Sequence, residues 1–179
     1  ADELERVGIR TSELAYYDPA GKLISSEPRG LGAGYNWPQY SIHRGALQRL
    51  LLEAVWQRLG RAAVRTGQRV TGVANDGRDG EAVLEVTDQA SGRAVTHTAD
   101  AVVVADGIRS QTRDRLRGAP TPLATNGWVM YRGTTKAKPF LTGHSMVIGG
   151  DEAQRTVVYP IAPGVLNWLL SRPREASAA

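Results

Sequence analysis

The chain of 179 residues contains no cysteine. This absence excludes disulfide bonds, thiolate metal sites and a cysteine nucleophile. Because disulfides accompany oxidising compartments, a chain without cysteine is compatible with a reducing cytoplasm, which is the location we predict. The first residues contain no charged-then-apolar leader, so secretion is not indicated.

Long apolar runs and blocks of like charge are also absent. No run reaches the roughly 18 apolar residues of a membrane span, so we predict no membrane partner. The 22 basic and 18 acidic residues give a net charge of +4 and are spread along the chain. No block of five like charges occurs, so nucleic acid is not a predicted partner either.

Several familiar catalytic and binding motifs are missing. His43, His97 and His144 are far apart and lack the spacing of metal ligands, so no metal site is predicted. The chain contains neither a G-x-S-x-G nucleophile elbow nor a Walker-type phosphate loop. The glycine-rich stretch 30–34 only superficially resembles a dinucleotide fingerprint, because we expect no strand before it and no helix after it; we predict a flexible loop.

Apolar periodicity and turn residues predict an α/β (α+β) fold. A hairpin is expected at 13–25 around a tight turn at Asp18-Pro19-Ala20-Gly21. The clearest helix is 44–59, with Ser41 or His43 as its cap and Gly60 after its end. The other expected elements are strands 69–74, 81–87 and 94–98 in an antiparallel meander, a short helix from Ser110 to about Leu116, and strands 128–133, 145–149, 155–161 and 165–170.

The segment 101–110 reads Ala-Val-Val-Val-Ala-Asp-Gly-Ile-Arg-Ser. Its five apolar residues predict a strand at 101–105 that is buried on both faces, as in a parallel sheet. Ligands bind at the carboxyl ends of such strands, so Asp106 is placed to bind nucleotide or sugar hydroxyls, and Gly107 lets backbone approach closely. The alternative is a plain strand-to-helix turn in which Asp106 caps local backbone.

Four further residues are candidates for ligand contacts. Arg44 begins the predicted helix, where free N–H groups attract anions; the alternative is a solvated arginine. Trp37 belongs to a loop rich in glycine, proline and aromatic residues. Tyr131 and Arg132 belong to a predicted strand. Aromatic rings at these positions are suited to stacking on a planar substrate, and equally to packing in a core.

The whole chain resembles the middle of a class A flavoprotein monooxygenase, of the para-hydroxybenzoate hydroxylase superfamily. The most specific match is Trp37-Pro38-Gln39-Tyr40-Ser41-Ile42-His43-Arg44-Gly45. The other matches, in order, are 26–30, 47–52, 64–67, 105–110, 130–133, 159–161 and 166–168. The resemblance covers residues 4 to 170 and is greatest to flavin-dependent hydroxylases that act on phenazine carboxylates.

The resemblance implies part of a Rossmann-like FAD/NAD(P)-binding domain with an antiparallel meander, plus a mixed β-sheet substrate domain. It assigns Asp106 and Gly107 to FAD and NAD(P)H, Arg44 to the ribityl and phosphate region of FAD, and Val70 loosely to the adenine. Trp37, Tyr131 and Arg132 are the candidate substrate residues. The implied domains are substrate-side strands and a loop at 1–41, a partial FAD-binding domain at 42–119, and a substrate-domain sheet with a polar tail at 120–179.

The implied function is NAD(P)H-dependent hydroxylation of an aromatic small molecule. In this family reduced FAD reacts with O2 and the flavin hydroperoxide transfers OH to the ring, so no side-chain acid or base is required. The family's N-terminal G-x-G-x-x-G does not occur, the family's later Gly-Asp motif is expected beyond the last residue given, and the chain begins with Ala1. We therefore expect a partial chain. The alternative is a truncated, non-catalytic relative that retains the scaffold as a binding or interaction module.

Overall fold

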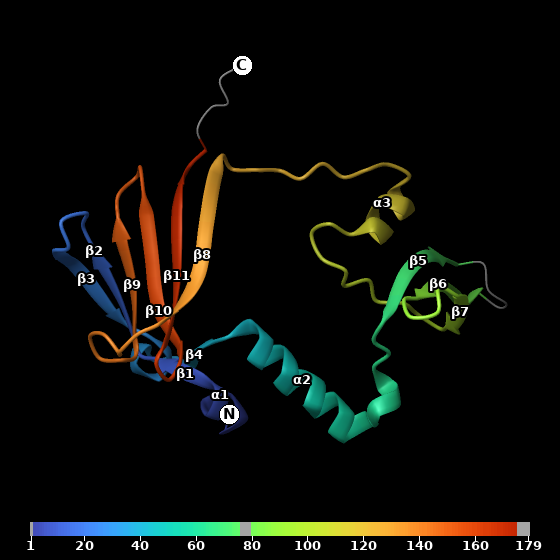
Figure 1. Cartoon of the computed structure of the whole chain (residues 1–179), viewed down its shortest axis with the longest axis horizontal. Coiled ribbons are helices and arrows are strands. Elements are labelled where there is room, and N and C mark those ends of the chain that lie inside the picture. Colours follow the sequence, from blue (N-terminus) through green and yellow to red (C-terminus); the bar gives the residue numbers. More distant parts are fainter. Residues whose placement is uncertain (1, 76–79, 175–179) are drawn as a thin grey trace, which may run out of the picture. The chain divides into compact units, whose positions relative to one another are not determined.

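The computed structural model describes residues 2–75 and 80–174. By internal contacts the chain divides into two compact units (Figure 1). The sheet unit consists of Ala1–Arg58 and Asn126–Ala179, and the meander unit of Leu59–Thr125. The two units are defined by internal packing alone and do not show which ligand each part binds. The expected functional domains 1–41, 42–119 and 120–179 therefore stay predictions.

A six-stranded mixed sheet forms the centre of the sheet unit. Its strand order is β3-β2-β9-β10-β11-β8, and only the β2–β9 pair is parallel. The strands are β2 (Glu13–Tyr17), β3 (Leu23–Pro28), β8 (Trp128–Lys136), β9 (Ser145–Gly150), β10 (Arg155–Ala162) and β11 (Val165–Pro173). The mixed sheet and its expected strands are therefore confirmed.

The β2–β3 hairpin is held by the turn that the sequence predicted. The Asp18 carboxylate accepts hydrogen bonds from the backbone N–H groups of Ala20, at 3.0 Å, and Lys22, at 2.8 Å. An aspartate that binds the backbone two residues ahead is the usual device of such turns. The hairpin prediction is thus confirmed together with its local cause.

Several short elements of the sheet unit were not predicted. Helix α1 (Asp2–Val7) leads into β1 (Gly8–Thr11), which pairs with β4 (Gln39–Ile42). The hydroxyls of Thr11 and Ser41, both buried, lie 2.6 Å apart across this pair. The expectation of a flexible loop at 30–34 is wrong: β3 ends two residues earlier, and a 3₁₀ helix covers Gly30–Ala33.

Helix α2 (Arg44–Leu59) has the predicted bounds. His43 caps it: the Nδ1 atom of its ring accepts a hydrogen bond from the N–H of Gly45 at 3.1 Å. Ser41, the other candidate cap, is instead paired with Thr11. None of the helix residues is buried, and Leu51 is 56% exposed. The apolar stripe therefore predicted the helix correctly, although its residues are half-buried or exposed and none is fully buried.

The meander unit contains the three predicted antiparallel strands, β5 (Gln68–Ala74), β6 (Ala82–Asp88) and β7 (Ala94–Ala99). Part of the β5–β6 turn, 76–79, lies outside the described residues. Helix α3 (Gln111–Arg117) follows, and the Ser110 hydroxyl caps it by accepting the N–H of Arg113 at 2.9 Å. Both the meander and this short helix are confirmed.

The prediction of a buried strand at 101–105 is wrong. The structure has no strand there, and Val103 is 91% exposed. A strand requires a neighbour that pairs with its N–H and C=O groups, and no described strand pairs with this segment. The run of β-branched residues indicates burial on both faces, but burial requires a pairing partner and covering layers that lie outside the segment itself.

Candidate functional site

Asp106 and Gly107 line a hollow of about 690 Å³ in the meander unit. Gly107 has φ +83°, and no atom lies within 4 Å of the position a Cβ would take. Glycine is therefore favoured there by backbone conformation and not by lack of space. The lining residues are Val104, Ala105, Asp106, Gly107, Ser110, Arg113, Leu116 and Arg117.

The Asp106 carboxylate is tied to the start of α3. Its Oδ2 atom accepts the N–H of Thr112 at 3.4 Å. The Ser110 hydroxyl has the largest effect on the pKa of Asp106 and lowers it; desolvation opposes this, and Thr112 reinforces the lowering. The group is thus a carboxylate at neutral pH and can accept hydrogen bonds from ligand hydroxyls. Both sequence interpretations, helix capping and ligand binding, are compatible with this position.

We expect Asp106 to titrate below its ordinary value of 3.8. A lowered folded-state pKa means that ionised Asp106 stabilises the fold at neutral pH, and that this contribution is lost as the pH falls through the folded-state pKa. NMR titration of the Asp106 carboxyl carbon measures the midpoint, which Ser110→Ala should raise. A wild-type midpoint at or above 3.8 would contradict the hydrogen-bond geometry.

Val70 lies on β5 of the same unit and is 39% exposed. The backbone carbonyl of the next residue, Thr71, accepts a hydrogen bond from the Arg115 side chain of α3. This bond connects the strand that carries Val70 to the helix that follows the Asp106 turn. The adenine role of Val70 stays a prediction.

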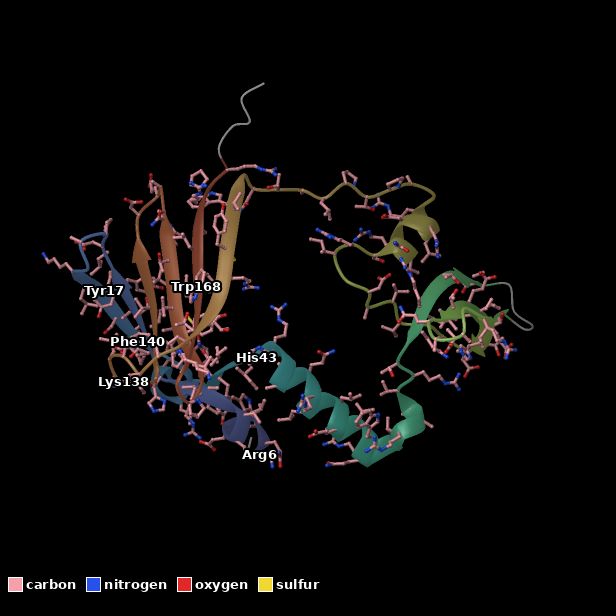
Figure 2. All side chains as sticks on the ribbon, in the orientation of Figure 1. Arg6, Tyr17, His43, Lys138, Phe140 and Trp168 are labelled. Atoms are coloured by element: carbon pink, nitrogen blue, oxygen red, sulfur yellow. The ribbon has the colours of Figure 1, made fainter. Side chains whose placement is uncertain are left out.

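Arg44 and Arg132 line one pocket of about 280 Å³ in the sheet unit. Arg44 is placed by the β4–α2 junction, where the labelled His43 lies (Figure 2). Arg132 projects from β8. The structure therefore brings together one candidate cofactor residue and one candidate substrate residue. The full lining is Ile42, His43, Arg44, Arg132, Thr134, Tyr159, Ile161 and Asn167.

Strand register gives this pocket a wall on one face of the sheet. Asn167 of β11 pairs with Tyr159 of β10 and with Thr134 of β8. Residues opposite each other on neighbouring strands share a face, and so do residues two apart on one strand, which adds Arg132. Only Arg132 of these four was selected from the sequence. Tyr159 and Asn167 belong to the matched stretches 159–161 and 166–168, whereas Thr134 lies just beyond the stretch 130–133; local sequence does not show which residues pair across strands.

The other two candidate substrate residues lie elsewhere. Tyr131 follows the alternation of β8 onto the opposite face from Arg132, and the Arg172 guanidinium carbon lies 5.9 Å from its ring centroid. Trp37 is 78% exposed in the segment before β4. Neither residue lines the pocket of Arg132, so their substrate roles stay predictions.

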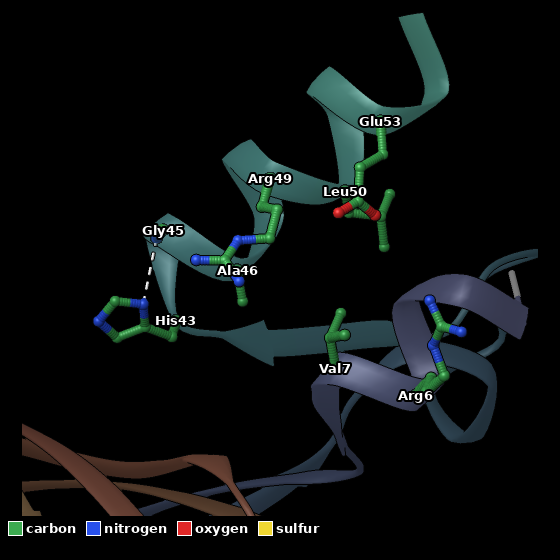
Figure 3. Close-up of a pocket in the computed structure, with 8 residues that line it drawn as sticks. All are labelled: Arg6, Val7, His43, Gly45, Ala46, Arg49, Leu50 and Glu53. Atoms are coloured by element: carbon green, nitrogen blue, oxygen red, sulfur yellow. Dashed lines mark hydrogen bonds between the residues drawn. The ribbon is translucent and has the colours of Figure 1, made fainter. Parts of the chain in front are cut away.

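A second hollow of the sheet unit, about 520 Å³, lies between α1 and the first turns of α2 (Figure 3). Figure 3 shows the hydrogen bond from Gly45 to His43 at its edge. Arg6 and Arg49 bring positive charge here, and Glu53 brings negative charge. This hollow could not be predicted from the sequence, because helix α1, which forms one side of it, was not predicted.

Among residues 2–75 and 80–174, no group of three or more His, Asp or Glu side chains is arranged to hold a metal ion. In the same part of the chain, no helix has the length and apolar character needed to cross a bilayer.

Comparison with known proteins identifies relatives of the chain. Residues 36–147 match the family model described as FAD binding domain. The phenazine 1,6-dicarboxylic acid hydroxylase PhzS of Lysobacter antibioticus is 39% identical, over 98% of this chain and 45% of that protein. The aurachin C monooxygenase/isomerase of Stigmatella aurantiaca is 32% identical, over 86% of this chain and 37% of that protein. The chain thus spans less than half the length of these curated relatives.

The fold is similar to that of Klebsiella pneumoniae HpxO, solved in complex with FAD and uric acid. The TM-score is 0.77 at 23% identity, covering 99% of this chain and 44% of that one. Fold, family model and sequence identity agree with the resemblance drawn from the motifs. The chain belongs to the family of FAD-dependent aromatic monooxygenases and is similar to its phenazine hydroxylases.

Proposed function

We propose that the protein hydroxylates an aromatic small molecule, using FAD that is reduced by NAD(P)H. The observation that carries this proposal is the 39% identity to a phenazine dicarboxylic acid hydroxylase across 98% of the chain. Because the chain spans less than half of that relative, the proposal concerns the activity of the whole protein. The alternative of a non-catalytic module is not favoured, since both named curated relatives are oxygen-inserting enzymes by name.

The Asp106 hollow suits the hydroxyl-bearing part of FAD. An ionised carboxylate accepts hydrogen bonds from ribose or ribityl hydroxyls, and Gly107 exposes backbone beside it. Arg117, also in the lining, supplies a positive charge that favours phosphate. In this proposal Asp106 and Gly107 hold FAD and contribute to NAD(P)H binding, Val70 lies near the adenine, and Arg44 binds the ribityl and phosphate region.

The chemistry belongs to the cofactor: bound FAD, once reduced, would activate O2 for transfer of one oxygen atom to the ring. The residues of this chain bind and orient the cofactor and the substrate, and exclude water. Arg44 supplies a fixed fork of donors to anionic groups, and Arg132 does the same on the substrate side. Tyr131 and Trp37 are retained as candidate stacking residues.

Flavin binding is the first test. We expect purified protein to be yellow, or to become so with added FAD, and to quench flavin fluorescence. With FAD, NAD(P)H and an aromatic acid such as phenazine-1-carboxylate, mass spectrometry should detect a product heavier by one oxygen atom. A colourless protein that never quenches FAD fluorescence would overturn the proposal.

A further inference from the structure

Asn126 and Gly127 form the one Asn-Gly pair of the sequence, immediately before strand β8. Both residues are exposed, and neither belongs to a helix or a strand. Gly127 has φ +79°, and no atom lies within 4 Å of the position that a Cβ would take. Because glycine has no Cβ, no side chain hinders the approach of the Asn126 side chain to the backbone nitrogen of Gly127.

A hydrogen bond folds the Asn126 side chain back over this peptide. The Oδ1 atom of Asn126 accepts the backbone N–H of Trp128 at 3.1 Å, which closes an Asx turn. The ring that this bond closes contains both Cγ of Asn126 and the backbone nitrogen of Gly127, so the turn brings these two atoms toward each other. The N–H donor also stabilises the negative charge that develops on Oδ1 when a nucleophile adds to Cγ. The turn therefore prepares Cγ for attack by the Gly127 nitrogen.

Comparable positions of the chain lack this combination. Asn36 and Asn167 are each followed by a tryptophan, whose side chain hinders ring closure, and Asn167 lies within β11, where strand pairing fixes its backbone. Asp106 also precedes a glycine, but the hydrogen bond from the Ser110 hydroxyl is the largest effect that lowers its pKa. An ionised carboxylate repels a nucleophile and has no good leaving group, whereas the amide of Asn126 has neither protection.

We propose that Asn126 is a site of spontaneous deamidation, which the Asx turn promotes. The backbone nitrogen of Gly127 bonds to Cγ of Asn126, and the Cγ–Nδ2 bond breaks. The proton lost from the Gly127 nitrogen passes through solvent to the departing amide, which leaves as ammonia. Water then opens the five-membered imide at either of its two carbonyls, which yields aspartate or isoaspartate at position 126. The inference is independent of flavin binding and of the proposed function.

The two products affect the start of β8 differently. A carboxylate at position 126 still accepts the N–H of Trp128, so the aspartate form keeps the turn. The isoaspartate form adds one CH2 group to the main chain before Gly127, whose carbonyl accepts the N–H of Arg174 at 2.7 Å. This extra group displaces the carbonyl, so we expect the hydrogen bond to Arg174 to weaken and the sheet unit to lose stability.

Peptide mapping by mass spectrometry, after incubation of the full chain in warm, mildly alkaline heavy-oxygen water, tests the site. We expect the peptide that contains Asn126 to exchange its amide for an acid with one heavy oxygen. It should separate into two products, one of which an isoaspartyl methyltransferase labels. Peptides that contain Asn36 or Asn167 should keep their amides. Gly127→Ala should slow the reaction at least about tenfold, equivalent to about 1.4 kcal/mol of barrier, because the added Cβ hinders ring closure.

Comparison of the folded chain with the chain unfolded in guanidinium tests the role of the turn. Asn126 should deamidate at least as fast in the folded chain, and a slower rate there would overturn the inference. Absence of acid at position 126, or equal acid formation at Asn36 and Asn167, would overturn it as well. If Gly127→Ala does not fold, Asn126→Gln replaces it: the longer side chain closes only a six-membered ring, so position 126 should keep its amide, and acid formation there at the wild-type rate would contradict ring closure.

Discussion

Replacing Asp106 by alanine is expected to weaken FAD binding roughly ten- to a hundredfold, because a charge-assisted hydrogen bond from the ligand is lost. Arg44→Ala should have an effect of the same size through the loss of a charged donor. The dissociation constants are measured by titrating FAD and following flavin fluorescence. The two variants test positions in different units of the chain, so they are independent tests of the assigned roles.

Each of these variants has a matched control. Asp100→Ala removes an exposed carboxylate from the meander unit, and Arg58→Ala removes an arginine from the last turn of α2. Neither residue lines a hollow described above, so FAD affinity should be unchanged. Unchanged affinity in both Asp106→Ala and Arg44→Ala would refute the roles carried over from the family. If Asp100→Ala and Arg58→Ala weakened FAD binding equally, the effect would be due to the change in net charge and not to the positions of Asp106 and Arg44.

Gly150→Ala is expected to lower the free energy of unfolding of the sheet unit by about 3 kcal/mol. Gly150 ends β9 with φ +112°, a conformation that side-chain-bearing residues rarely adopt. A Cβ there would lie 2.1 Å from the backbone oxygen of Gln154, so the β9–β10 turn would have to move. Backbone strain and a clash with main chain act together at this position.

Tryptophan fluorescence in a urea titration measures this loss cleanly. All four tryptophans, at positions 37, 56, 128 and 168, belong to the sheet unit, so the signal reports that unit and not the meander unit. Gly21→Ala is the control: Gly21 also has positive φ, but nothing lies within 4 Å of its Cβ position, so only about 1 kcal/mol of strain is expected. If the free energy of unfolding of Gly150→Ala were equal to or higher than that of Gly21→Ala, the predicted clash with Gln154 would be refuted.

The elements predicted correctly are those whose cause is local. The Asp18 turn, the His43 cap, the apolar stripe of α2 and the Ser110 cap all act within a few residues of where they occur. Strands β1 and β4 were missed because each has four residues, and their pairing joins segments about thirty residues apart. Their pairing is a property of the folded chain, and the sequence of either segment alone does not indicate it.

For the apolar segment before Asp106 the error was the opposite one: a strand was predicted where the structure has none. Its composition is that of a strand covered on both faces, yet the described chain supplies no strand beside it. The hydrophobic pattern of a segment indicates whether it favours a buried position. Whether it becomes buried depends on the strands that pair with it and the layers that cover the sheet. The Asp106–Gly107 turn itself was found from the sequence because an Asp-Gly pair after an apolar run is a local signal.

The sequence by itself determined the family, the order of most elements, and Arg44, Asp106 and Arg132 as candidate residues, because motifs, turns and caps are encoded over short distances. Only the tertiary structure decided that Arg132 meets Arg44 and Asn167 in one pocket while the adjacent Tyr131 does not. The physical reason is strand register: side chains alternate between faces, so pairing across β8, β10 and β11 determines which of two neighbouring residues can reach a ligand.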